Sequence, residues 1–98
     1  MKKIRTPEVD ELFDAILSLK TRTECYKFFI DALTVKEIQE IAQRLKAAKM
    51  LTDGASYVEV CAETGMSTAT VSRVSKALEH GEGGYKLVMK RTEKKATE

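Results

Sequence analysis

Short hydroxyl and cationic side chains recur over one stretch of the chain, from Ser67 to Lys76. If this stretch is a helix capped by Ser67, its outward face carries Thr68, Ala69, Thr70, Ser72, Arg73 and Lys76. Hydroxyls can bond base edges or phosphates, methyl groups can contact thymine, and cations can reach phosphates. The pattern therefore predicts a helix that enters the major groove of double-stranded DNA. The alternative is an ordinary helical hairpin with a solvated polar face.

The preceding residues indicate how such a helix would be positioned. Ser56 and Glu59 have the spacing of a capping box and open a short helix, and Gly65 allows the tight turn that follows. Val60, Cys61 and Met66 would face inward on this first half. On the second helix the buried stripe would be Val71, Val74 and Leu78. Residues 56–79 thus have the organisation of a helix-turn-helix.

Catalytic and metal-binding patterns have little support. His80 is the only histidine, the carboxylates are spread along helix faces, and Gly81–Gly84 lacks the lysine and hydroxyl of a phosphate loop. Cys25 and Cys61 fall on apolar faces with no histidine nearby, which favours buried reduced thiols over a zinc site or a disulfide. The sequence predicts a protein that is not an enzyme and has no metal.

Composition limits the class of protein. The 98 residues are 43% hydrophobic and 33% charged, as in a soluble globular domain, and the formal net charge is only +2. DNA binding would therefore depend on a local patch and not on overall charge. With no apolar run of membrane-spanning length and no signal peptide, we expect a cytoplasmic protein without a membrane partner.

The remaining helices should form an all-α scaffold. Thr6 and Pro7 open the first helix, the second runs from about Glu24 to Ala32 after a turn at 20–23, and Thr34 caps a third that ends near Leu51. The second helix is apolar over more than half its circumference, which favours cover by another subunit. We expect one domain over 1–98, with dimerisation helices at 6–52, a hinge at 81–84, a short helix at 85–91 and a flexible tail at 92–98.

Four segments resemble the Trp repressor superfamily, within its branch of small Trp-repressor-like bacterial proteins. The matching segments are L-T-V-K-E at 33–37, Q-R-L-K at 43–46, Asp53-Gly54, and G-M-S-T-A-T-V-S-R at 65–73. The resemblance covers about half the chain, roughly residues 33–78. It implies a Trp-repressor-like multi-helix fold in which the N-terminal helices of two subunits interlock into a homodimer.

The resemblance also implies a ligand pocket for a small-molecule corepressor at Leu33, Thr34, Arg44 and Arg73. Two departures argue against L-tryptophan as that ligand. Val74 stands where the repressor has a glycine, and Ala77 replaces a serine that helps to hold the ligand's amino group. In the alternative interpretation, Arg73 binds a phosphate and Arg44 pairs with Glu40 or Asp31.

The main hypothesis is a homodimeric, sequence-specific, repressor-like transcriptional regulator that binds DNA. Two alternatives stay open at this point. The first is a protein-interaction adaptor that keeps the helical hairpin without reading DNA, because Glu59, Glu63 and Glu79 weaken the positive field. The second is a repressor gated by an unknown small molecule.

Overall fold

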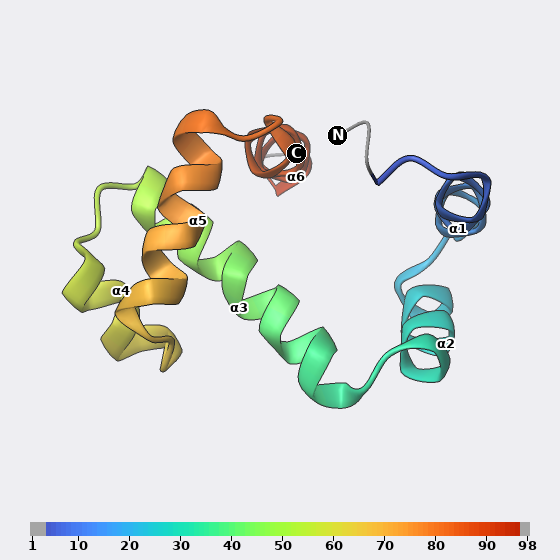
Figure 1. Ribbon diagram of the computed structural model, residues 1–98, viewed down its shortest axis with the longest axis horizontal. Coiled ribbons are helices and arrows are strands. Elements are labelled where there is room, and N and C mark those ends of the chain that lie inside the picture. Colours follow the sequence, from blue (N-terminus) through green and yellow to red (C-terminus); the bar gives the residue numbers. More distant parts are fainter. Residues whose placement is uncertain (1–3, 97–98) are drawn as a thin grey trace. The chain divides into compact units, whose positions relative to one another are not determined.

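The computed structural model describes residues 4–96, which form six α-helices and no strand within that range (Figure 1). The helices are α1 Pro7–Leu17, α2 Arg22–Ala32, α3 Val35–Thr52, α4 Tyr57–Thr64, α5 Thr68–His80 and α6 Gly84–Ala96. The prediction of an all-α fold is confirmed.

Local caps determine where the first three helices begin. The Thr6 hydroxyl accepts a hydrogen bond from the Val9 amide at 3.1 Å, with Pro7 in the first turn, as expected. Thr34 and Glu37 bond each other's backbone amides at 3.1 and 2.9 Å at the start of α3, which is the expected capping box.

The start of α2 differs from the expectation. The helix begins at Arg22, two residues before the predicted start near Glu24, because Thr21 acts as its cap. The Thr21 hydroxyl accepts a hydrogen bond from the Glu24 amide at 3.1 Å, while the Glu24 carboxylate accepts one from the Lys20 amide at 2.8 Å. The predicted turn therefore shortens by two residues.

The chain forms two compact units, residues 1–38 and residues 39–98. In the first unit neither α1 nor α2 contains a buried residue, and large apolar side chains such as Leu17 and Tyr26 are exposed. Cys25 is exposed as well, so the prediction of a buried thiol is wrong for this residue in the single chain, because nothing covers this side of α2. The assignment of residues 6–52 to dimerisation stays a prediction.

The second unit has a small, closely packed core. It consists of Ala47 and Ala48 from α3, Val60 from α4, and Val71 and Val74 from α5, all buried. The alanine pair lets α4 and α5 approach the α3 backbone closely, and this contact holds the helical hairpin in place. Ala48 was expected on the apolar face of α3, but Ala47 was not.

The last helix is longer than the sequence suggested. The structure has α6 from Gly84 to Ala96 where a helix at 85–91 and a flexible tail at 92–98 were expected. Tyr85 and Met89 pack against the core, and the Thr92 hydroxyl donates to the Val88 carbonyl at 2.8 Å, which supports the added turns. Residues 97–98 of the predicted tail lie outside the described part of the chain.

Candidate nucleic-acid interface

The hairpin of α4 and α5 has the caps expected from the sequence. The Ser56 hydroxyl accepts from the Glu59 amide at 3.1 Å, and the Glu59 carboxylate accepts from the Ser56 amide at 2.9 Å. These bonds lower the pKa of Glu59 below its ordinary value, chiefly through the Ser56 backbone amide. Gly65 ends α4 with φ of 75°, the left-handed conformation that the tight turn requires.

A second polar residue that the sequence reasoning missed holds the same turn. The buried hydroxyl of Thr64 donates to the Val60 carbonyl at 2.7 Å and accepts a hydrogen bond from the Met66 amide at 3.2 Å. It thus connects the last turn of α4 to the segment that leads into α5. The signal that could have revealed it is the placement of a threonine directly before the turn glycine, four residues after an inward-facing valine.

The start of α5 is fixed by Ser67. Its hydroxyl accepts from the Thr70 amide at 3.2 Å and lies 3.0 Å from the Thr70 hydroxyl. Part of the hydrogen-bonding capacity of Ser67 and Thr70 is therefore used within the first turn. Thr68 lies 3.9 Å from the Cys61 sulfur, so the tip of α5 also contacts α4.

Most of the predicted DNA-contacting residues are open to solvent. Exposed residues are Ser67, Thr68, Ala69, Arg73 and Lys76, while Thr70 and Ser72 are half-buried. The opposite side of α5 buries Val71 and Val74 in the core. The helix therefore has one face anchored to α3 and α4 and another that presents short polar and cationic side chains.

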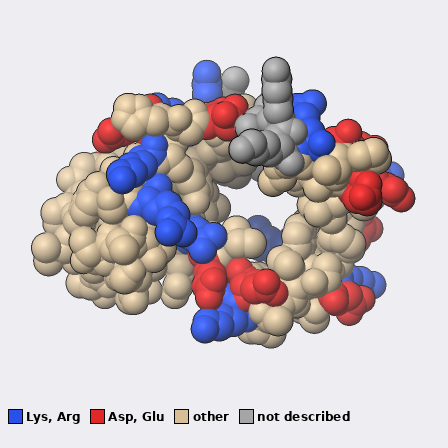
Figure 2. Space-filling model, viewed as in Figure 1, with Lys and Arg blue, Asp and Glu red and all other residues tan. Residues whose placement is uncertain are grey.

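The cations on this face are available for an anionic partner. Within the described residues, neither Arg73 nor Lys76 forms an ion pair. The ion pairs present there join Lys46 to Glu63 at 3.2 Å and His80 to Glu79 at 3.6 Å, and both are exposed. Figure 2 shows Lys and Arg side chains close together over the region of α3 and α5.

A cavity of about 280 Å³ lies beside the start of α5. Its lining residues are Glu40, Gln43, Arg44, Met66 and Thr70. Arg44 is therefore at a cavity, as the predicted ligand site requires, but Arg73 is not among the lining residues. No ion pair joins Arg44 to Glu40 within the described part of the chain. Val74 is only 3% exposed, so its side chain occupies space inside the core.

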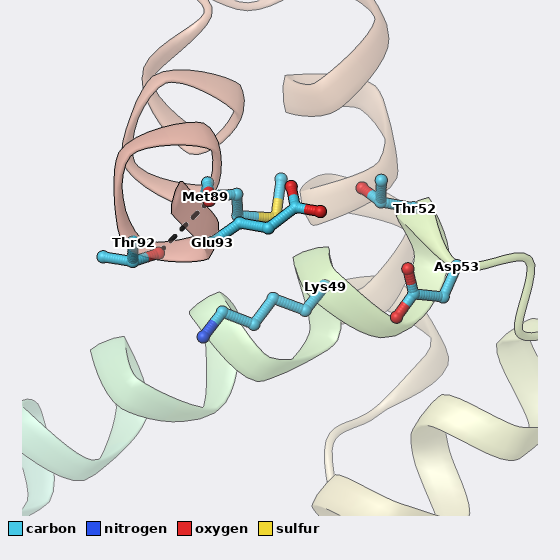
Figure 3. Close-up of a pocket in the computed structure, with 6 residues that line it drawn as sticks. All are labelled: Lys49, Thr52, Asp53, Met89, Thr92 and Glu93. Atoms are coloured by element: carbon cyan, nitrogen blue, oxygen red, sulfur yellow. Dashed lines mark hydrogen bonds between the residues drawn. The ribbon is translucent and has the colours of Figure 1, made fainter. Parts of the chain in front are cut away.

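A second cavity, of about 340 Å³, lies between the end of α3 and α6 (Figure 3). The hydroxyls of Thr52 and Thr92 donate to carbonyls of their own helices, at 2.8 Å in each case. The Lys49 side chain points away from the carboxylates of Asp53 and Glu93 (Figure 3). Its polar groups therefore do not converge on a common point.

Two further findings concern the described residues. Histidine, cysteine and carboxylate side chains do not come together there in any group of three or more that could hold a metal ion. In addition, none of the helices in that part of the chain is both long enough and apolar enough to cross a membrane.

Comparison with known proteins shows the family. The family model described as Trp repressor protein matches residues 7–93. The chain is 48% identical to the uncharacterised protein YerC of Bacillus subtilis (strain 168) over 96 residues, which are 98% of this chain and 92% of YerC.

Solved structures agree. One from Staphylococcus aureus, described as a candidate Trp repressor, has a TM-score of 0.89 at 48% identity and covers 94% of this chain and 92% of its own. A TrpR-like protein from Eubacterium eligens ATCC 27750 has a TM-score of 0.90 at 44% identity, over 94% of this chain and 95% of its own. The chain therefore belongs to the Trp repressor protein family.

Proposed function

We propose that this protein is a cytoplasmic, homodimeric transcriptional regulator that binds specific double-stranded DNA sequences and acts as a repressor. The observation that carries the proposal is the division of α5 into two faces. Val71 and Val74 fix the helix to the core, while Thr68, Arg73 and Lys76 are exposed. Membership in the Trp repressor family supports a DNA-binding regulator and not an enzyme.

The side chains of α5 divide by what they can recognise. Thr68, Ala69 and Ser72 are short enough to lie against base edges, where hydroxyl and methyl groups distinguish the base pairs. Thr70, Arg73 and Lys76 are suited to phosphates and sugars, which position the helix without reading sequence. A two-fold dimer would place two such helices about one DNA turn apart, roughly 34 Å.

Selection of bound duplexes from a random pool tests the proposal directly. We expect an enriched motif with two related half-sites whose centres are about one turn apart. Retention on a heparin column should also fall as salt increases. If no motif is enriched and the protein elutes in the void volume at low salt, the proposal is wrong and the adaptor hypothesis is favoured.

A further inference from the structure

An apolar groove crosses the second unit on a side formed by α3, α6 and the end of α5. Its volume is about 460 Å³, and its lining residues are Ile41, Leu45, Ala77, Glu82, Gly84, Tyr85 and Val88. Ile41 is 55% exposed and Val88 is 44% exposed, although both are large and apolar. Such a surface is costly to leave in water and indicates a partner.

The helix α1 has the complementary apolar character. Val9, Leu12, Phe13, Ile16 and Leu17 follow the helical spacing of one stripe, yet no residue of α1 is buried. Phe13 is 53% exposed and Leu17 is 80% exposed. An amphipathic helix of this kind is stable in water chiefly when its apolar stripe is covered.

The charges of α1 and α6 are opposite. Within Pro7–Leu17 the charged residues are Glu8, Asp10, Glu11 and Asp14, with no cation. Within Gly84–Ala96 they are Lys86, Lys90, Arg91, Lys94 and Lys95 against the single carboxylate of Glu93. Lys86, Lys90 and Arg91 are exposed, and none of these three forms an ion pair among the described residues.

We infer that α1 of a second copy of this chain docks in the groove between α3 and α6, with its acidic side next to the cations of α6. The apolar stripe of α1 covers Ile41 and Val88, and opposite charges determine the choice and the direction of the partner helix. Because a two-fold dimer repeats every contact, two such dockings form at once. This inference rests on the homodimer of the proposed function and names the elements that form it.

Two charge-reversal variants test the docking. The first is Asp10→Lys with Asp14→Lys on α1, and the second is Lys90→Glu with Arg91→Glu on α6. Each variant alone places like charges together at both copies of the contact. We expect its dimer dissociation constant, measured by sedimentation equilibrium without DNA, to rise about tenfold or more.

Mixing the two variants in equal amounts is the decisive step. In a mixed dimer the reversed α1 meets the reversed α6, and the two unmodified helices also meet, so both contacts become attractive. We expect mixed dimers with a dissociation constant near the wild-type value. The charge-conserving variants Asp10→Glu with Asp14→Glu, and Lys90→Arg with Arg91→Lys, should dimerise like the wild type. Circular dichroism confirms that every variant is helical.

Two results would overturn the inference. If each reversed variant dimerises like the wild type, the charges of α1 and α6 do not meet. If each is weakened and mixing restores nothing, α1 docks within its own chain or elsewhere. Selection of DNA by the wild type is measured separately. A protein that selects no DNA but passes the mixing test would therefore disprove the proposed function without affecting this inference.

Discussion

The hydroxyl of Thr64 lies 2.7 Å from the carbonyl of Val60 and is buried at the turn between α4 and α5. The same oxygen accepts a hydrogen bond from the Met66 amide at 3.2 Å. One side chain therefore satisfies two backbone groups on either side of Gly65. The geometry of the hairpin depends on this residue as well as on the glycine.

Thr64→Val should destabilise the protein, because it leaves the Met66 amide without this acceptor. A buried donor that loses its partner costs about 1–3 kcal/mol, and chemical denaturation followed by circular dichroism measures the loss. Thr52→Val is a matched control, since Thr52 donates to the Ala48 carbonyl at 2.8 Å but is exposed at the end of α3. Equal losses for the two variants would contradict the special role of Thr64.

Gly65→Ala should cost about 1–2 kcal/mol of stability, because its φ of 75° forces an L-residue into the left-handed region. A Cβ atom there would meet no other atom within 4 Å, so the cost is conformational and not steric. Gly65→Asn should lose less, since asparagine tolerates this region better. At Gly81 the situation is reversed, because an added Cβ would collide with the Ala77 carbonyl. If asparagine and alanine cost the same at Gly65, backbone conformation is not the cause.

Arg73→Ala and Thr68→Ala should weaken DNA binding in different ways. Loss of the Arg73 charge should weaken all sequences alike and reduce the slope of log K against log salt by about 0.9 for one phosphate contact. Loss of the Thr68 hydroxyl should change the preferred motif, at about 1–3 kcal/mol for a direct base contact. Binding isotherms on the selected motif and on a scrambled duplex separate the two effects. Lys49→Ala, an exposed cation outside α5, is the control, and a change in motif caused by Arg73→Ala would contradict the assigned roles.

L-tryptophan should not raise the melting temperature of the protein. Ligands that bind the native state stabilise it, but Val74 is 3% exposed and its side chain fills the core beside α3. Thermal shift over a panel of amino acids and metabolites measures this, with the selected DNA as a positive control. A saturable increase with L-tryptophan would show that a pocket opens despite Val74.

Acid should weaken the cap of α4 through Glu59. Hydrogen bonds from Ser56 hold the pKa of Glu59 below 4.5 in the folded protein. The folded state therefore binds this proton less readily than the unfolded state, and the stabilisation is present above about pH 4.5 and lost as the pH falls through the lowered pKa. Glu59→Gln should lower stability at neutral pH and flatten its decline between about pH 5 and pH 3, measured by urea unfolding. Glu93→Gln controls for net charge, and an unchanged pH profile in Glu59→Gln would refute the prediction.

The sequence by itself determined the helices and their caps. Thr6, Thr34, Ser56 and Ser67 were each identified from the residues beside them, and each caps a helix in the structure. These features depend on hydrogen bonds between residues three apart, so the local sequence contains all the information needed. For the same reason the exposed face of α5 could be identified from its spacing alone.

Only the tertiary structure decided which residues are covered. Ala47 is buried because α4 and α5 pack against that side of α3, and α6 extends to Ala96 while its Tyr85 and Met89 pack on the same core. Cys25 lies on an apolar face like Cys61, yet it is exposed because no helix of its own unit covers it. Burial depends on contacts between residues far apart in the chain, and an apolar pattern shows that a face needs cover without showing what supplies it.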